Sequence, residues 1–458
     1  MFFHYGCKPF KKWFHQINYN GGIYLKNRRS SIVALAATST MALAMTFSVT
    51  VPNVFAKGKA TAPVEQISFW YGLGGQLSSD VQQMVSLFNK THPGIHVTAT
   101  YQGSYSGGGP EQQKLIAALG AGTAPTMAQI EVHSMPVFAS SGHLMNLTSF
   151  MHSSKTDNTV NFLKGMLVST QYQGQYYGIP FNRSVPVLYY NKTYFKRAGI
   201  SSPPITWNQL ALDAKKLTKG SGKSKVYGFE PLVDWWPWEA TVWSNGGQIL
   251  SPNLKQALFD TPQATHILSI WQNLIKQGYA TVETSPQYWT LTTEDFIHGR
   301  TAMDVDSIGD AGEVTSGIGN KFNWGTAMLP KGTSLNVPPG GGDIAIMTGA
   351  SADKVKAAET FIEWWTSPIR AAQWSEMTGY LPVQTAAVKE KSYQDYLKKH
   401  PQYRTALNEL KYQHAAPASA NYLAVLQYAE QALQGVLDEG KPVQATMHAA
   451  AVQADSVL

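Results

Sequence analysis

The segment from residue 180 to residue 191 constrains the fold of this chain more than any other. It has the sequence PFNRSVPVLYYN, in which a polar beginning is followed by β-branched and aromatic residues that predict a buried strand. Residues 192–199 follow as a short predicted helix, which ends before a breaker with two prolines. Thr206 and Gln209 have the spacing of a capping box and predict a helix through Leu217. These features indicate one unit of an α/β domain.

Strand and helix patterns alternate along most of the chain. Before residue 180 we expect strands at 66–71, 95–101 and 127–132, with helices at 77–89 and 112–119. The first helix has Val81, Met84, Val85 and Phe88 on its inward face. This order predicts a mostly parallel sheet covered by helices. Later strands are expected at 226–229, 301–307, 322–329 and 343–347, and the chain after residue 353 has a helical pattern.

The N-terminal 56 residues have the pattern of a targeting segment. They carry six Lys or Arg and no acidic residue, and an apolar stretch at 32–51 leads to Val54-Phe55-Ala56. We expect a signal peptide at 1–56 that is cleaved before Lys57, with an uncleaved anchor as the alternative. Arg28 and Arg29 match a twin-arginine signal in part, so the export route stays open. The only cysteine is Cys7, so no cysteine for a lipoprotein anchor is expected.

Charge and motifs exclude several classes of function. Without residues 1–56 the chain has 30 basic and 29 acidic residues, so no nucleic-acid partner is expected. No H-E-x-x-H, G-x-S-x-G or phosphate-loop motif occurs, and the histidines have no metal-ligand spacing. Ser351 to Lys354 spell S-x-x-K, but a serine cap on the following helix explains them. We therefore predict no catalytic residue, no metal site and no cofactor.

Asp304 and Asp306 are two residues apart on a predicted strand, so they point to one face. Three interpretations are open. The carboxylates could act as the acid and base of a secreted glycosidase, accept hydrogen bonds from sugar hydroxyl groups, or lie at a solvated strand end.

Four tryptophans lie within nine residues, at positions 235, 236, 238 and 243. Such a dense run is not expected to bury every ring on one side. At least one ring, with Trp236 and Trp238 as the candidates, is therefore expected to stack on the carbon skeleton of a sugar or a glycerol.

The sequences of these segments resemble those of a known family. PFNRSVPVLYYN, the P-x-T-W-N-Q-L phrase at its second helix, Ile67 to Trp70 and Gly379 to Pro382 are similar to the extracellular solute-binding proteins of bacterial ABC importers for sugars and glycerol phosphates. The glycerol-3-phosphate-binding members are the most similar. The resemblance implies a type II, maltose-binding-protein-like fold of two α/β lobes with a helical C-terminal region. Three crossings near residues 180, 305 and 343 would divide the chain into an N-terminal lobe, 57–180 plus 306–342, and a C-terminal lobe, 181–305 plus 343–458.

The resemblance also implies a set of ligand-binding positions. They are the Tyr of Y-x-G-x-Y, the acid ending the third strand, the second Ser of the F-N-S-S phrase, the Ser after the A-M strand, a glycine-run amide and the Tyr of G-Y-L-P. In this chain these positions are Tyr105, Glu131, Ser184, Ser307, Gly341 or Gly342, and Tyr380.

One departure concerns phosphate. The family's late Arg would fall at Leu426–Gln427, and no Arg follows Arg404. Arg183 replaces the first Ser of the family phrase, so it could bind a phosphate or be neutralised by Asp306. The carboxylates of Asp306 and Asp310 flank Ser307 and would oppose a dianion.

The implied function is capture of a small polyhydroxylated solute and its delivery to the transmembrane subunits of an ABC permease. Glycerol-3-phosphate or a glycerophosphodiester is the expected ligand, and a neutral di- or oligosaccharide is the alternative. The protein is expected to be a monomer, exported to the periplasm or the outer face of the cytoplasmic membrane. A secreted glycosidase and a sugar-sensing receptor subunit are the competing functions.

Overall fold

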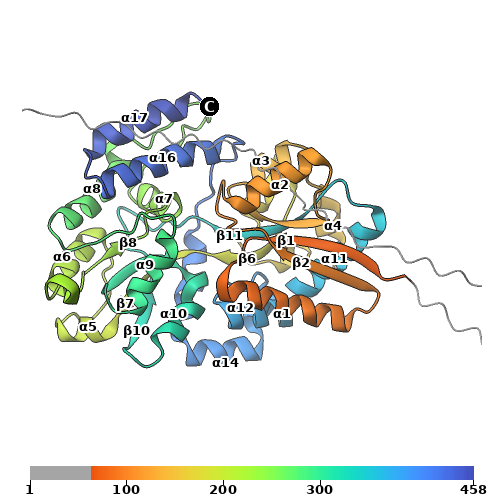
Figure 1. Ribbon diagram of the computed structural model, residues 1–458, viewed down its shortest axis with the longest axis horizontal. Coiled ribbons are helices and arrows are strands. Elements are labelled where there is room, and N and C mark those ends of the chain that lie inside the picture. The colour runs from red at the N-terminus through yellow and green to blue at the C-terminus, as the bar shows by residue number, and fades with distance from the viewer. Residues whose placement is uncertain (1–62) are drawn as a thin grey trace, which may run out of the picture. The chain divides into compact units, whose positions relative to one another are not determined.

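The computed structural model describes residues 63–458, so the expected signal peptide and its cleavage site lie outside the described residues. A five-stranded sheet has the order β2-β1-β3-β11-β6 (Figure 1). Its strands are β1 (Glu65–Tyr71), β2 (Ile95–Tyr101), β3 (Met127–Glu131), β6 (Ile179–Ser184) and β11 (Gly340–Ile346). β1 is parallel to β2 and β3, whereas β11 is antiparallel to β3 and β6. The predicted parallel pairing is therefore confirmed for the first three strands, and the complete sheet is mixed.

A four-stranded sheet has the order β10-β7-β9-β8. Its strands are β7 (Pro186–Asn191), β8 (Glu230–Pro231), β9 (Met303–Ser307) and β10 (Trp324–Ala327). The strand expected at 226–229 forms only isolated bridges, and the paired strand begins one residue later. A separate hairpin consists of β4 (Gln171–Tyr172) and β5 (Gln175–Tyr176).

The segment at 180–191 forms two strands that belong to different sheets. β6 ends at Ser184, β7 begins at Pro186, and Val185 between them is completely buried. The chain therefore passes from the five-stranded to the four-stranded sheet at this point, which confirms the crossing expected near residue 180.

Strand pairing corrects the expected division of the chain after residue 305. β9 and β10 both lie in the four-stranded sheet, so β10 does not join the N-terminal sheet as the assignment of 306–342 required. Residues 343–346 of β11 pair with β3 and β6, although 343–458 was assigned to the C-terminal lobe. The strand expected at 343–347 begins earlier, because Gly340, Gly341 and Gly342 form the first three residues of β11.

Helices cover the sheets, and several have the predicted ends. α1 (Gly75–Thr91) buries Val81, Met84, Val85 and Phe88 as expected. α6 (Trp207–Leu217) begins with the predicted cap, in which Thr206 Oγ1 accepts a hydrogen bond from the backbone N–H of Gln209 at 3.2 Å. The remaining helices are α2 (Pro110–Ala121), α3 (Met135–Ser140), α4 (Thr148–Ser153), α5 (Lys192–Arg197), α7 (Trp235–Ser244), α8 (Pro262–Lys276), α9 (Tyr288–Ile297), α10 (Ala311–Ile318), α11 (Ala352–Thr366), α12 (Pro368–Thr378), α13 (Thr385–Lys389), α14 (Lys391–Lys399), α15 (Arg404–Glu409), α16 (Tyr422–Leu437) and α17 (Val443–Asp455).

The C-terminal helices divide between the two sheets. α11 packs on β1, β6 and β11, and α12 packs on α1. α16 and α17 instead pack on α7 and α8 beside the four-stranded sheet (Figure 1). Ser351 caps α11, because its Oγ accepts from the backbone N–H of Lys354, which confirms the structural interpretation of S-x-x-K. Within residues 63–458, no helix has the length and apolar character that crossing a membrane requires.

Candidate functional site

The positions matched to the ligand-binding family converge where strands of the five-stranded sheet end. Glu131 at the end of β3 pairs with Gly342 of β11, and Ser184 at the end of β6 pairs with Gly340. Both side chains are buried. Positions that are far apart in the sequence are thus neighbours at one sheet edge.

Two tyrosines from distant segments meet at this edge. Tyr105, after β2, lies beside Tyr380, after α12, and Asn182 Nδ2 of β6 donates to the Tyr105 hydroxyl at 3.3 Å. Burial raises the pKa of Tyr105 to about 12, and the negative charges of Asp310 and Glu131 act in the same direction. Both phenols therefore keep their protons at neutral pH and can donate a hydrogen bond.

The glycine run lets the backbone approach its neighbours closely. Gly341 has φ of +89°, and a Cβ there would lie 1.6 Å from the carbonyl oxygen of Asn182. A Cβ on Gly340 would lie 2.3 Å from the ring of Trp236 and 2.5 Å from Ser184 Oγ. Only glycine is therefore compatible with these positions.

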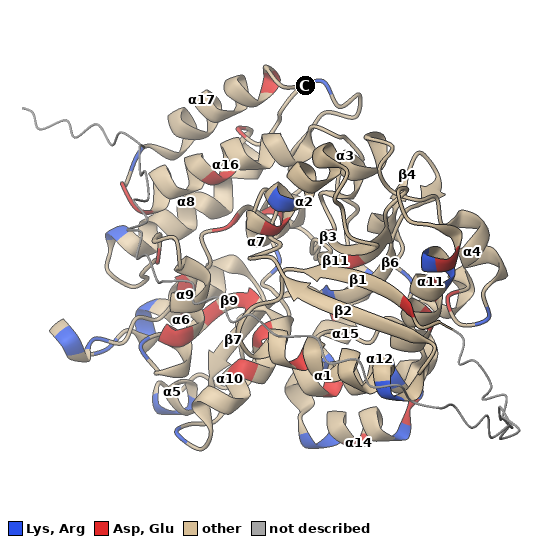
Figure 2. Ribbon diagram, turned by 45° about the vertical axis from the view of Figure 1, so that its right-hand side comes forward, with Lys and Arg blue, Asp and Glu red and all other residues tan. Residues whose placement is uncertain are grey.

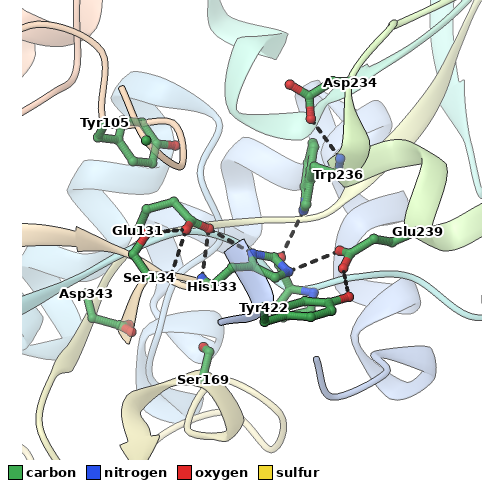
Figure 3. A network of polar contacts seen from close by, with 12 residues as sticks. Tyr105, Glu131, His133, Ser134, Ser169, Asp234, Trp236, Glu239, Asp343 and Tyr422 are labelled. Carbon is green, nitrogen blue, oxygen red and sulfur yellow. Dashed lines mark hydrogen bonds and ion pairs between the residues drawn. The ribbon is translucent and has the colours of Figure 1, made fainter. Parts of the chain in front are cut away.

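A chain of buried polar contacts joins β3 to α7 and α16 (Figure 3). Glu131 Oε1 accepts from Nδ1 of His133 at 2.8 Å, and Glu131 Oε2 accepts from the backbone N–H and hydroxyl of Ser134. His133 Nε2 lies 3.0 Å from Glu239 Oε2 on α7. The hydroxyl of Tyr422 on α16 donates to the other oxygen of Glu239.

The charge of His133 follows from these contacts. Burial by itself would lower the pKa of its imidazole, but the carboxylates of Glu239 and Glu131 raise it to about 10. His133 is therefore an imidazolium at neutral pH and donates from both ring nitrogens. The contact between His133 and Glu239 could not be predicted from local sequence, because the two residues are 106 positions apart.

The four rings of the 235–243 run, at least one of which was expected to stack on a ligand, are all buried. Trp235, Trp236, Trp238 and Trp243 are all at most 6% exposed. Trp238 lies in the core, where its ring meets Phe259 edge-to-face at 5.8 Å, so it cannot stack on a ligand without unpacking the core. The rings of Trp235 and Trp243 instead contact His133 and His414.

Trp236 remains at the candidate site. Its Nε1–H donates to the carbonyl of Pro339 at 2.9 Å, which connects α7 to the segment entering β11. Its ring stacks on the half-buried Trp289 of α9, with centroids 6.0 Å apart and planes at 20°. Trp289 was missed in the sequence because it lies 46 residues after the end of the tryptophan run.

Two carboxylates hold the aromatic residues of α9. Asp310 Oδ2 accepts from Trp289 Nε1 at 2.9 Å, and Asp234 accepts from the hydroxyl of Tyr288. Burial raises the pKa of Asp234 to about 6, against the opposing effect of this hydrogen bond. The site therefore combines flat aromatic rings with acidic groups.

Arg183 has a different partner from those expected. Its guanidinium is completely buried, with Nη1 3.1 Å from Asp343 Oδ1 and Nη2 donating to Ser169 Oγ and to the carbonyl of Met166. The expected neutralisation by Asp306 is thus wrong, because Asp343 of β11 is the counter-ion. Burial lowers the pKa of Arg183, and the charge of Asp343 opposes this effect.

Asp304 and Asp306 are both about 1% exposed, so the interpretation as a solvated strand end is wrong. Asp306 accepts from Thr293 Oγ1 at 2.6 Å and from the backbone N–H of Ser307 at 2.7 Å. Burial raises the pKa of Asp306, and the charges of Asp310 and Asp304 add to the effect. Asp306 is thus held in place by hydrogen bonds within the protein.

Ser307 ends β9 and caps the next turn, because its Oγ accepts from the backbone N–H of Gly309. The position of the family's late Arg carries no cation here. Leu426 is buried, and the exposed Gln427 lies beside Gly108.

Two cavities, of about 540 and 470 Å³, lie beside α5 and α1 and are not lined by any of the matched residues.

Comparisons with known proteins agree with this geometry. The family profile described as bacterial extracellular solute-binding protein matches residues 74–372. The sn-glycerol-3-phosphate-binding periplasmic protein UgpB of Pectobacterium atrosepticum is 30% identical over 360 residues, which cover 73% of this chain and 77% of that protein. UgpB of Escherichia coli is 29% identical over 372 residues, which cover 77% and 82% of the two chains.

Solved structures with the same fold carry different ligands. UgpB from Mycobacterium tuberculosis in complex with glycerophosphocholine matches with a TM-score of 0.76 and 25% identity, over 87% of this chain and 98% of that chain. An ABC substrate-binding protein from Listeria monocytogenes in complex with cycloalternan matches with a TM-score of 0.75 and 21% identity, over 86% and 98%.

Proposed function

Because this chain belongs to the bacterial extracellular solute-binding proteins, two-lobed α/β binding subunits of ABC importers, we propose that it captures a polyhydroxylated solute between its lobes and delivers it to a permease. The observation that carries this proposal is the convergence of the matched positions. Tyr105, Glu131 and Tyr380 lie at the edge of one sheet, and Trp236 reaches this edge from the other side of the molecule. Phenol donors and indole rings are the groups that bind hydroxyls and C–H faces of polyols.

The charges around this region favour a ligand that is not a phosphate dianion. Arg183, which was expected to meet a phosphate, is neutralised by Asp343, and His133 is held by two carboxylates. Asp234 and Asp310 contribute further acidic groups beside the aromatic rings. A dianion would meet repulsion without a free cation among the matched residues. We therefore place a neutral sugar first and glycerol-3-phosphate behind it.

A glycerophosphodiester with a cationic head group is the second candidate. Trp236 and Trp289 present stacked rings, and Asp310 is hydrogen-bonded to the second of them. An ammonium group is attracted by aromatic faces and by carboxylates. The glycerophosphocholine bound by the Mycobacterium tuberculosis relative has this chemistry.

The remaining parts of the proposal follow from the same observations. We propose that the protein binds without catalysing a reaction or using a cofactor, as expected of a member of a solute-binding family. It acts as an exported monomer without a lipoprotein anchor and does not bind nucleic acid. The N-terminal lobe contains the five-stranded sheet with α11 and α12, and the C-terminal lobe contains the four-stranded sheet with α16 and α17.

A ligand panel tests the proposal. The exported protein would be titrated by calorimetry with maltose and larger oligosaccharides, glycerophosphocholine and glycerol-3-phosphate. We expect saturable binding of a sugar or of glycerophosphocholine, with compaction in small-angle X-ray scattering as the lobes close. Trp289→Ala is expected to weaken binding at least tenfold, and Trp364→Ala, at a half-buried tryptophan on α11, serves as the control. Tight binding of glycerol-3-phosphate alone would contradict the charge argument and leave the transport role intact.

A further inference from the structure

Carboxylates gather on the side of the four-stranded sheet where β8, α9 and the loop before α9 meet. Glu230 of β8, Glu283 of the loop and Asp295 of α9 each bring a carboxylate oxygen within 4.8 Å of the others. Asp304 of β9 is the register partner of Glu230, so its side chain lies on the same face. Figure 2 shows acidic residues along β9 and α9.

Glu230 has no partner of its own within residues 63–458. Its side chain is 0% exposed, and neither carboxylate oxygen has a hydrogen-bond partner. Oδ1 of the buried Asp304 has none either. A buried carboxylate in this state is costly, since neither water nor a donor replaces its hydration. The cluster thus holds buried carboxylate oxygen atoms that have no hydrogen-bond donor among the described residues.

The charge balance of the cluster is negative. Arg300 forms an ion pair with Asp295 and its charge also lowers the pKa of Glu230 and of Glu283, but its guanidinium is about half exposed and is a single positive charge among four carboxyl groups. Burial raises the pKa of Glu230 to about 10, and the charges of Asp304, Asp295 and Glu283 act in the same direction. A proton on Glu230 would relieve the repulsion in part, and a cation would relieve it for all the carboxylates.

We propose that Glu230, Glu283 and Asp295 bind a Ca²⁺ ion. The donors are carboxylate oxygens without His or Cys, which suits a hard cation rather than Zn²⁺. Ligands on opposite sides of Ca²⁺ are up to about 5 Å apart, whereas those of Mg²⁺ are about 4 Å apart. Three carboxylate oxygens within 4.8 Å of one another fit around Ca²⁺, which takes several protein oxygen ligands, whereas Mg²⁺ keeps several of its waters.

The ion would stabilise the helix that carries part of the candidate site. α9 contributes Asp295 to the cluster and also carries Trp289, whose ring stacks on Trp236. Ca²⁺ would thus connect this helix to β8 and to the loop that contains Glu283. The metal site does not depend on the identity of the solute, so it can be tested without a solute.

The test uses the exported protein after treatment with a chelator. Calorimetric titration with CaCl₂ is expected to give one site per chain, with a Kd in or below the range of about 0.1–1 mM typical of extracellular Ca²⁺ modules. At about 100 times the Kd, Ca²⁺ is expected to raise the melting temperature by about 3 °C. MgCl₂ is expected to bind at least tenfold more weakly.

Matched variants separate the site from general charge effects. Glu230→Gln is expected to abolish the Ca²⁺-dependent shift, and Glu283→Gln, at a half-buried loop position, gives the same test if the first variant fails to fold. Glu294→Gln, next to Asp295 on α9, lies outside the cluster and is expected to behave like the wild type. No heat and no shift up to about 10 mM CaCl₂, equal affinity for Mg²⁺, or an unchanged response in Glu283→Gln would each overturn the proposal.

Discussion

The contacts of His133 with Glu131 and Glu239 make the stability of the folded protein fall as the pH becomes alkaline. The pKa of His133 is about 10 in the folded protein and about 6.5 in an unfolded chain. The folded state therefore binds the additional proton, and its stability falls as pH rises between these values. Each pH unit costs about 1.4 kcal/mol, so the loss between pH 7 and pH 9.5 approaches about 3 kcal/mol.

Urea unfolding of the wild type and of His133→Gln at several pH values measures this contribution. We expect the wild type to lose several kcal/mol more than the variant between pH 7 and pH 9.5, because glutamine does not titrate. His448→Gln is the matched control, since His448 contacts Asp260 but is 65% exposed. Its pH dependence should follow that of the wild type. Parallel curves for the wild type and His133→Gln would show that the imidazolium does not stabilise the fold.

Three further substitutions have definite expected outcomes. Arg183→Met leaves a buried carboxylate unpaired and should cost about 3–5 kcal/mol in urea unfolding, while the folded fraction keeps its ligand affinity in calorimetry. Gly341→Ala should lower the free energy of unfolding by more than about 3 kcal/mol or prevent folding, because its Cβ would lie 1.6 Å from a backbone oxygen. Gly142→Ala, where the Cβ meets open space at φ of +75°, should lower the free energy of unfolding by only about 1 kcal/mol. Trp238→Ala should lower the free energy of unfolding by about 3–5 kcal/mol, which denaturation measures, and a loss below about 1 kcal/mol would contradict its core position.

Local features were predicted well from the sequence because their physical causes are local. The apolar face of α1 follows from the 3.6-residue period, and Thr206 and Ser351 cap helices through bonds to residues three positions away. The family phrases also identified positions such as Glu131 and Tyr105 that converge at one sheet edge.

Only the tertiary structure decided which strands belong to the same sheet and which charged groups form ion pairs. Residues 180–191 predict one buried strand with a polar beginning, and this local pattern does not indicate that Val185 separates strands of two sheets. Arg183 is neutralised by Asp343, 160 residues later, and His133 by Glu239, 106 residues later. The tryptophan run is buried because helices from distant parts of the chain cover it from several sides, whereas the sequence pattern describes only one helix. The partner of a buried charge depends on how separate elements pack, and local periodicity carries no information about that packing.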